Sequence, residues 1–269
     1  MRHQLDAPIL AHRRLAEYEY EVVLHAPAVA AEARAGQFLE VLYDHSLSPY
    51  TRRPFSVFKV DRQAGTVTIV YLARGAFTQG MARQRVGETL SIVGPLGNHF
   101  VASDAPGVRH VLVAGGVGAP PMYLLAWEMV QAGEDAGRLV VIDGARSREL
   151  LVAVREFQEL GVGLRLVTDD GSAGRRGVVT DLLREALDEG GPAQVYSCGP
   201  TAMLRAVSEL CAERAVPCLV SVETMMPCGL GVCMGCAVKI RDASHPDGYQ
   251  VLRGCHEGPI FRGEDVLWD

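Results

Sequence analysis

Four cysteines near the end of the chain constrain its fold more than any other feature of the sequence. Cys228, Cys233 and Cys236 follow one another with the spacing C-x4-C-x2-C, and Cys255 lies further along. This is the ligand spacing of a plant-type 2Fe–2S cluster. Glycines between the cysteines let the chain turn sharply enough for three thiolates to converge, and they bring backbone N–H groups close to the sulfurs. The spacing therefore predicts a 2Fe–2S cluster, and with it the transfer of single electrons.

Other uses of the cysteines fit this pattern less well. A zinc site of four cysteines normally presents two separated C-x2-C pairs, and this chain has one; zinc remains the alternative. A disulfide framework is not indicated, because 7 Cys in 269 residues is a sparse and odd set. A Rieske centre needs two histidine ligands. His256 directly follows Cys255 and His245 is isolated, so we interpret both as ordinary polar residues.

Length and charge narrow the class of protein. The 269 residues suffice for two domains and a small additional module, and the apolar fraction of 48% supports sizeable cores. The net charge is −6 and the sequence has no block of Lys or Arg, so no nucleic-acid or membrane-surface partner is indicated. The apolar stretch at 111–130 contains glycines, prolines and Glu128, which favours a strand, a turn and a helix over a membrane span. We expect a cytoplasmic protein, in agreement with free thiols.

The order of the predicted elements indicates three units. Short β-rich runs separated by turn residues predict an antiparallel barrel with strands at 19–25, 38–43, 55–60, 66–72 and 91–93. Strands and helices then alternate, which is typical of a parallel sheet covered on both faces. Those strands are predicted at 111–114, 139–142, 164–168, 194–197 and 219–222, and the helices at 122–131, 149–160, 179–187 and 202–214. We expect a multidomain chain: a barrel at 1–104, an α/β nucleotide-binding domain at 105–224 and a loop-rich cluster module at 225–269.

Segments of the predicted barrel suit a flavin. Arg53-Pro54-Phe55-Ser56 opens a strand, where the Arg can neutralise a phosphate and the Ser hydroxyl can approach the isoalloxazine edge. Taken alone, a surface Arg before a strand is the simpler interpretation. Gly75-Ala76-Phe77-Thr78 is predicted to open a short helix whose N–H groups can hold a pyrophosphate. Gly94-Pro95-Leu96-Gly97-Asn98 closes the barrel with a tight turn, which can be purely structural.

Three places in the second domain suit a nicotinamide nucleotide. Gly115-Gly116-Val117-Gly118 joins a strand to a helix and lets the backbone approach a phosphate, although a plain turn has the same pattern. Asp143 ends the next strand and is predicted to accept a hydrogen bond from a ribose hydroxyl, which favours NAD. Arg146 and Arg148 follow and can instead bind the phosphate of NADP. Cys198-Gly199-Pro200 forms a third strand-to-helix junction, which places Cys198 near the nicotinamide or buries it as a small residue.

In this order the motifs resemble the ferredoxin–NADP reductase superfamily and, within it, the electron-transfer subunits of type B dihydroorotate dehydrogenases. The resemblance covers essentially the whole chain, and the cluster string is its most specific part. The matching segments are Arg53-Pro54-Phe55-Ser56, Val70-Tyr71-Leu72, Gly94-Pro95-Leu96-Gly97-Asn98, Gly115-Gly116-Val117-Gly118, Cys198-Gly199-Pro200, Glu223 and the four cysteines. The chain departs from the family at Phe77, where Gly is usual, and in a long span before Cys255 that contains a predicted hairpin at 245–248.

The resemblance implies FAD, NAD and a 2Fe–2S cluster in a chain without catalytic residues of its own. It implies an FMN-containing dihydroorotate dehydrogenase partner, in a heterotetramer of two copies of each subunit, that serves pyrimidine biosynthesis. Electrons from the partner would pass through the cluster and FAD to NAD+. The alternative is an NAD(P)H-dependent reductase subunit that serves ferredoxin, sulfide, polysulfide or a hydrogenase. A non-enzymatic redox sensor bound to a regulator is a third, less well supported interpretation.

Overall fold

The computed structural model describes residues 2–43 and 51–268, and its first part is a closed antiparallel barrel with the strand order β1-β2-β5-β4-β3-β6. The strands are His3–Arg14 (β1), Glu19–His25 (β2), Phe38–Leu42 (β3), Arg53–Asp61 (β4), Thr66–Leu72 (β5) and Thr89–Leu96 (β6). Two short helices, Pro27–Glu32 (α1) and Ala76–Met81 (α2), lie in the connections. The predicted barrel is therefore confirmed, and β2 and β5 have the predicted limits.

The barrel closes through a strand that sequence patterns missed. β1 pairs with β2 on one side and with β6 on the other, so it joins the two ends of the sheet. Its polar and charged residues interrupt the apolar alternation, and its side chains are mostly exposed or half-buried. By contrast, five consecutive residues of β5 are buried, which gives that strand a strong apolar signal.

The second part is a seven-stranded sheet with the order β10-β9-β8-β7-β11-β12-β15. Its strands are Arg109–Gly115 (β7), Leu139–Ala145 (β8), Gly163–Thr168 (β9), Arg175–Arg176 (β10), Ala193–Cys198 (β11), Cys218–Ser221 (β12) and Ile260–Arg262 (β15). Its helices are Ala119–Gln131 (α3), Val154–Leu160 (α4), Val179–Asp188 (α5) and Thr201–Glu213 (α6), with 3-10 turns at Gly116–Gly118 (η1), Ala136–Arg138 (η2) and Arg148–Leu150 (η3). The predicted parallel α/β domain is confirmed.

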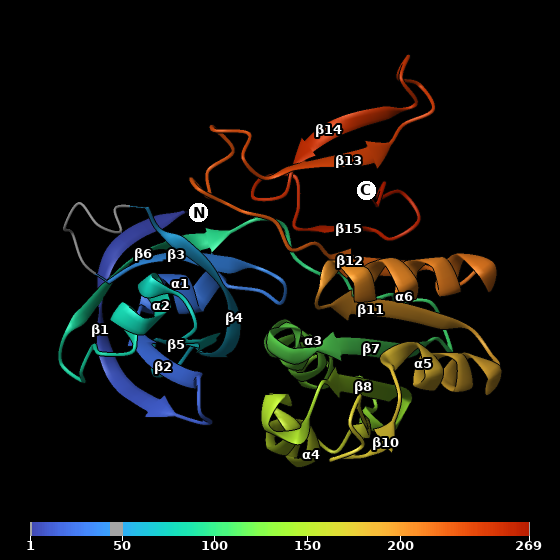
Figure 1. Cartoon of the computed structure of the whole chain (residues 1–269), viewed down its shortest axis with the longest axis horizontal. Coiled ribbons are helices and arrows are strands. Elements are labelled where there is room, and N and C mark those ends of the chain that lie inside the picture. Colours follow the sequence, from blue (N-terminus) through green and yellow to red (C-terminus); the bar gives the residue numbers. More distant parts are fainter. Residues whose placement is uncertain (1, 44–50, 269) are drawn as a thin grey trace.

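Alternate residues of the central strands pack on opposite layers of helices. In β7, Val111 and Val113 belong to the core with α5 and α6, whereas Leu112 and Ala114 belong to the core with α3, α4 and the barrel. Successive side chains of a strand point to opposite faces, so a continuous apolar run is what a strand covered on both sides needs. Figure 1 shows α5 and α6 on the side of the sheet away from the barrel.

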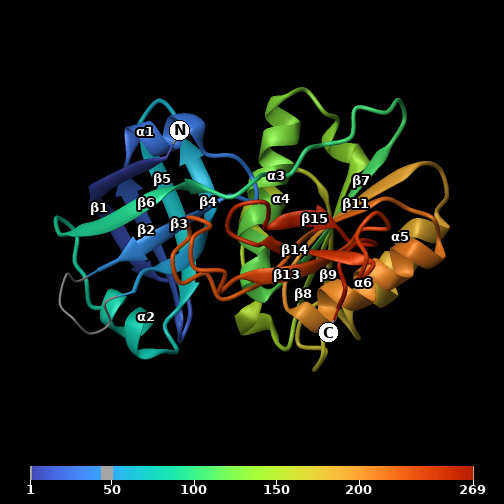
Figure 2. The same ribbon diagram turned by 90° about the horizontal axis from the view of Figure 1, so that it is seen from above.

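The C-terminal segment contains more regular structure than predicted. Ala237–Arg241 (β13) and Tyr249–Arg253 (β14) form an antiparallel hairpin, and β15 pairs antiparallel with β12 at the edge of the main sheet. The hairpin predicted at 245–248 is confirmed, but the segment is more than a loop-rich module, because β15 is part of the nucleotide-binding sheet. Figures 1 and 2 show the segment lying across both the barrel and the sheet.

The barrel and the α/β part are held together by direct contacts. Phe58 of β4 packs against Tyr123 of α3, with ring centroids 5.2 Å apart. Lys59 Nζ lies 2.9 Å from a carboxylate oxygen of Glu156 in α4. Helix α3 thus lies between the sheet and the barrel wall (Figure 2). Among the described residues, none of the helices is long and apolar enough to cross a membrane.

Candidate functional site

A cavity of about 800 Å³ lies between the barrel and the carboxyl ends of the parallel strands. This edge of an open α/β sheet is where such folds bind ligands. Most of the predicted cofactor-binding residues line it, and they come from both parts of the chain. They are Pro54, Phe55, Ser56, Val70, Tyr71, Leu72, Gly115, Gly116, Gly118, Cys198, Gly199 and Pro200. The structure therefore brings together segments that are up to about 145 residues apart in sequence.

The barrel contributes an aromatic wall to the cavity. Phe55 meets Tyr71 edge to face, with ring centroids 5.7 Å apart. The Tyr71 hydroxyl lies 2.8 Å from Nε2 of His12, and His12 Nδ1 lies 2.8 Å from the carbonyl oxygen of Gln84. Because that carbonyl only accepts, Nδ1 donates to it and Nε2 accepts the Tyr71 proton. Tyr71 is thereby fixed in one orientation, and burial raises its pKa well above the ordinary value for tyrosine, so the hydroxyl stays protonated.

Four predicted flavin residues lie outside the cavity lining, in a patch beside it. The Arg53 guanidinium sits over the Phe77 ring, 5.3 Å from its centroid. Phe77 is buried against Tyr43 and Phe55, which explains an aromatic residue where the family usually has glycine. The Thr78 hydroxyl accepts from the Gly75 N–H at 3.1 Å and so caps α2, as predicted for the start of this helix.

Two strand-to-helix turns meet so closely in the cavity that only glycine fits. A Cβ on Gly118 would lie 2.1 Å from the carbonyl oxygen of Cys198, and one on Gly199 would lie 2.5 Å from the Met203 side chain. At Gly116 the backbone has φ of +54°, which glycine tolerates, and a Cβ there would meet open space. Gly118 and Gly199 thus serve close packing at the cavity floor, whereas Gly116 serves the positive φ of its own turn.

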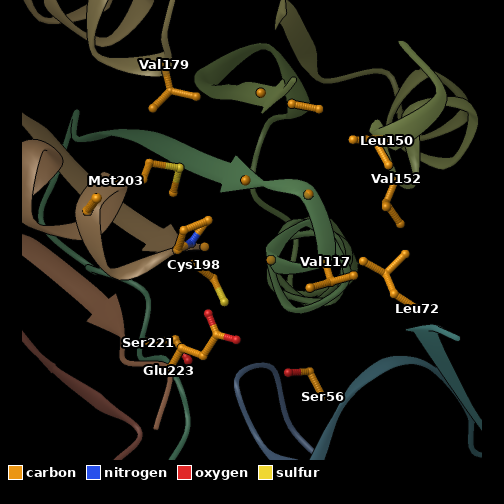
Figure 3. Close-up of a pocket in the computed structure, with 18 of the residues that line it drawn as sticks. Ser56, Leu72, Val117, Leu150, Val152, Val179, Cys198, Met203, Ser221 and Glu223 are labelled. Carbon is orange, nitrogen blue, oxygen red and sulfur yellow. The ribbon is translucent and has the colours of Figure 1, made fainter. Parts of the chain in front are cut away.

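Polar groups from three elements converge at one end of the cavity (Figure 3). Ser56 of β4, Cys198 at the end of β11 and Glu223 just after β12 all line it. Burial raises the pKa of the Cys198 thiol to about 12, so it is a neutral thiol at physiological pH. Glu223 was singled out in the sequence only through the resemblance, because a single Glu after a strand carries no signal of its own.

Asp143 is not brought to this cavity. Its carboxylate is fully buried, neither oxygen has a hydrogen-bond partner among the described residues, and it is absent from the cavity lining. Burial, followed by the nearby charge of Glu19, raises its pKa well above the ordinary value. Gly144, Ala145 and Arg146 line the cavity instead, because the last residues of β8 reach the sheet edge while Asp143 points into the interior. Asp169, after β9, also lines the cavity, and sequence reasoning missed it.

The four predicted cluster cysteines come together where the C-terminal segment packs on the barrel. Sγ of Cys236 and Sγ of Cys255 are 3.3 Å apart and buried, whereas Cys233 is exposed. Gly229 and Gly231 have φ of +64° and +80°, as expected for glycines that turn the loop, whereas Gly235 lacks the positive φ expected of it and the neighbouring Met234 has one of +58°. The described residues contain no His, Cys, Asp or Glu group placed to hold a single metal ion. A 2Fe–2S cluster spreads its four ligands over two irons.

Backbone donors surround the cysteine sulfurs. Leu230 N–H lies 3.4 Å from Cys228 Sγ, Gly231 N–H 3.2 Å from Cys255 Sγ, and Gly235 N–H 3.5 Å from Cys233 Sγ. Burial alone raises the pKa of the Cys228 thiol, but backbone N–H groups outweigh it and lower the pKa to about 6. Four convergent sulfurs with N–H donors facing them fit the thiolate ligands of an iron–sulfur cluster.

The cluster loop packs directly on the barrel. Phe38 and Leu96 share a small apolar core with Met226, Cys236 and Cys255. Met226 also lines the cavity, as do Phe38 and Thr224, so the cavity and the cysteine loop share a wall. A second contact is the buried Glu40 of β3, whose Cγ lies 2.4 Å from where a Cβ on Gly229 would be. Burial, followed by the nearby Cys228 sulfur, raises the pKa of Glu40 to about 8.

The closing turn of the barrel anchors the end of the cluster segment. Asn98 Nδ2 donates to the carbonyl oxygens of Glu257 and Ile260, each at 2.8 Å, and Asn98 Oδ1 accepts from the Ile260 N–H at 2.8 Å. A Cβ on Gly97 would lie 2.6 Å from the Pro259 ring. The turn predicted at 94–98 is therefore structural, and its partner is a segment about 160 residues away in sequence.

Comparisons with known proteins agree with this arrangement. Residues 112–209 match the model of an oxidoreductase NAD-binding domain, and residues 223–267 match the iron–sulfur cluster binding domain of dihydroorotate dehydrogenase B. A structure of NADH-dependent reduced ferredoxin-NADP oxidoreductase is similar over 98% of this chain and 90% of that chain, with a TM-score of 0.85 and 32% identity. A ferredoxin reductase in carbazole 1,9a-dioxygenase, with a TM-score of 0.69 and 21% identity over 80% of this chain and 67% of that chain, shares the fold.

Curated relatives extend over the full length of the chain. The protein from Desulforamulus reducens called dihydroorotate dehydrogenase B (NAD(+)), electron transfer subunit, is 34% identical over 269 residues, which are 100% of both chains. The protein of the same description from Caldanaerobacter subterraneus subsp. tengcongensis is 35% identical over 268 residues, again 100% of both. The chain belongs to the family of electron transfer subunits of dihydroorotate dehydrogenase B (NAD(+)).

Proposed function

We propose that this chain carries electrons between a partner subunit and NAD+ by way of a 2Fe–2S cluster and FAD. The partner is an FMN-containing dihydroorotate dehydrogenase subunit that acts in pyrimidine biosynthesis. The observation that carries the proposal is the single cavity that joins the flavin strands, the nucleotide turns and the approach to the cysteine loop. A shared wall keeps the two redox sites close, as electron transfer between them requires. The description of the full-length relatives supports the same function.

Each part of the chain has a proposed role toward one cofactor. Pro54–Ser56 and Val70–Leu72 hold the flavin ring, and the patch of Arg53, Gly75, Phe77 and Thr78 holds FAD phosphates. Gly115, Gly116 and Gly118, with Cys198–Pro200, hold NAD, while Cys228, Cys233, Cys236 and Cys255 hold the cluster. Bound FAD supplies the exchange between a hydride, which carries two electrons, and single electrons. The chain itself excludes water with the apolar side chains that line the cavity and needs no acid–base pair.

The surface around the cysteine loop supports a protein partner. Met225 and Val232 are 79% and 80% exposed, and Leu230 and Met234 are also exposed. These four apolar side chains flank the exposed Cys233. Contiguous exposed apolar groups of this kind mark interaction sites, and a partner that covers them brings its own redox group close to the cluster.

The test is anaerobic affinity purification of the tagged chain from its own host, followed by iron, FAD and FMN assays. We expect a second subunit that contains FMN and oxidises dihydroorotate with NAD+ as acceptor. The purified single chain should reduce dyes with NADH yet show no dihydroorotate oxidation. A complex without FMN, or oxidation of dihydroorotate by the single chain, would contradict the proposal. Cys233→Ser should remove the cluster absorbance and leave FAD and NADH-driven dye reduction in place.

The 32% identical ferredoxin-NADP oxidoreductase structure favours a second candidate function. In that case the chain is an NAD(P)H-dependent reductase subunit that serves ferredoxin. Recovery of ferredoxin, or of a partner that reduces it, in the same purification would support this candidate against the first.

We further propose a cytoplasmic location, a heterotetramer of two copies of each subunit, and three units at residues 1–104, 105–224 and 225–269. Free thiols in the cysteine loop support the location. The exposed apolar surface supports the assembly, and the change from barrel to α/β sheet supports the first boundary. The mass of the native complex, measured by light scattering, tests the stoichiometry.

A further inference from the structure

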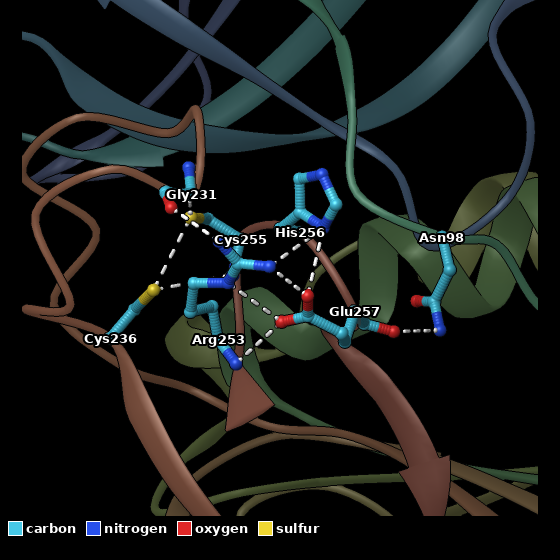
Figure 4. A network of polar contacts seen from close by, with 7 residues as sticks. All are labelled: Asn98, Gly231, Cys236, Arg253, Cys255, His256 and Glu257. Carbon is cyan, nitrogen blue, oxygen red and sulfur yellow. Dashed lines mark hydrogen bonds and ion pairs between the residues drawn. The ribbon is translucent and has the colours of Figure 1, made fainter. Parts of the chain in front are cut away.

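Arg253, at the end of β14, ties the cysteine loop to the segment that carries the fourth cysteine (Figure 4). One guanidinium nitrogen donates to the carbonyl oxygen of Gly231 at 2.6 Å. Its Nε donates to Glu257 Oε2 at 3.0 Å, and its other terminal nitrogen forms a second, shorter contact with Glu257 Oε1. Arg253 therefore uses both sides of its planar head, which is the geometry that suits guanidinium groups.

Gly231 is held from two directions by these contacts. Its carbonyl accepts from Arg253, and its N–H donates to Cys255 Sγ at 3.2 Å. Its φ of +80° suits glycine, and a Cβ there would lie 3.0 Å from the His256 ring and Cβ. The Arg253 contact therefore supports the residue whose N–H donates to Cys255 Sγ, and little free space surrounds that residue. The hydrogen bond to a ligand sulfur thus depends on a side chain that is not itself a ligand.

Arg253 and Glu257 are permanent charges at physiological pH. A guanidinium is always protonated, and a carboxylate paired with it is ionised. Figure 4 shows Arg253 beside Cys236 and Cys255, with Glu257 on its other side. A positive group therefore faces two of the cysteines, with a negative group behind it. The backbone of Glu257 is held in turn by Asn98 of the barrel, which keeps the pair in place.

We propose that Arg253 is a positioning residue for the iron–sulfur cluster and sets its reduction potential, with Glu257 attenuating the effect. The proposal rests on the cluster assigned under the proposed function. Reduction adds one electron to a cluster that already carries negative charge, so a nearby cation stabilises the reduced form more than the oxidised form. A hydrogen bond to a ligand sulfur also stabilises the reduced form and so raises the reduction potential. Arg253 supplies the positive charge directly, and it supports the hydrogen bond to the sulfur through its contact with Gly231.

The test is an EPR-monitored redox titration of the full chain, purified anaerobically with whatever partner accompanies it. Arg253→Gln should lower the midpoint potential, because it removes the cation and loosens Gly231. Glu257→Gln should raise the potential, because it removes the opposing anion while Arg253 can still contact Gly231. Arg253→Lys keeps the charge without the planar fork, so its potential should lie between that of Arg253→Gln and that of the unmodified chain.

Arg241→Gln is the matched control. Arg241 pairs with Tyr249 at the far end of the same hairpin, whereas Arg253 pairs with Ala237, so the same charge is lost away from the cysteines. This variant should leave the potential unchanged, since exposed charges beyond a Debye length of about 8 Å are largely screened. Iron and sulfide contents are measured on every variant.

The outcomes separate this proposal from the assignment of function. Equal potentials for Arg253→Gln, Glu257→Gln and the unmodified chain, at full iron content, would overturn it. Loss of iron with an unchanged potential in the clusters that remain would overturn it as well, because Arg253 would then be merely structural. A missing cluster in the unmodified chain would refute the cluster assignment itself. The identity of the partner does not affect the order of the potentials.

Discussion

Replacing Asn98 by alanine tests whether the barrel turn holds the cluster segment. The substitution removes three hydrogen bonds of 2.8 Å to the backbone of Glu257 and Ile260. A hydrogen bond contributes roughly 0.5–1.5 kcal/mol net, so the three together contribute roughly 1.5–4.5 kcal/mol. Water can reach the half-buried site and replace some of them, which places the expected loss in the lower half of that range. The backbone bond from the Asn98 N–H to the Gly258 carbonyl remains.

The assay is urea unfolding of the anaerobic chain, followed by the visible absorbance of the cluster. Asn98→Ala should lower the midpoint for cluster loss, whereas Asn98→Asp keeps one acceptor and loses two donors and should fall as far or further. Glu209→Ala is the control, since it removes an exposed ion pair with Arg205 that contributes about 0.5 kcal/mol or less. If Asn98→Ala changes stability no more than this control, the anchoring role of Asn98 is refuted.

Three further predictions follow from close packing and burial. Gly229→Ala, at φ of +64°, places a Cβ 2.4 Å from the Glu40 side chain and should lose most of the bound iron. Gly248→Ala is the control: its φ is +73° but its Cβ meets open space, so it should lower stability by only about 1 kcal/mol and retain the iron. Gly118→Ala should abolish NADH binding, measured by quenching of flavin fluorescence, because its Cβ would meet the Cys198 carbonyl oxygen at 2.1 Å. Gly133→Ala, just after α3 and with nothing within 4 Å of the added Cβ, should retain it. Burial and then Glu156 raise the pKa of Glu19 from 4.5 to about 7. Between pH 4.5 and about 7, Glu19 therefore holds a proton in the folded chain that it has lost in the unfolded chain. The free energy of unfolding falls as pH rises through this window. Glu19→Gln should remove that part of the slope in urea unfolding at pH 5 and pH 8; an unchanged slope would contradict this reasoning.

Sequence patterns were most reliable where the determining interactions are local. The limits predicted for β2 and β5 agree with the structure, and α5 and α6 begin and end within one residue of the predicted limits. These elements have strong apolar periodicity and turn residues at both ends. β1 lacked that periodicity and was missed. β15 was missed for another reason, since three residues at a sheet edge carry no periodic signal.

The predictions for the site residues also succeeded where the determining interactions are local and failed where they are not. The spacing of Cys228, Cys233 and Cys236 is a property of one short loop, so the sequence alone predicted that their sulfurs would converge. The role of Asp143 depended on which way the side chain faces at the end of its strand, and the fold turned it into the interior. Arg53 was predicted from a flavin-binding motif, but only the structure shows that its guanidinium lies over the ring of Phe77 in α2.

The sequence by itself determined the C-x4-C-x2-C loop, the change from barrel to α/β sheet and the glycine-containing turns, because each depends on residues close together in the chain. Only the tertiary structure decided how these parts meet. It packed Gly118 against the Cys198 carbonyl and placed Arg253 against Gly231. Such contacts depend on the packing of whole elements and on backbone positions to within an ångström or so, and no spacing along the chain encodes them.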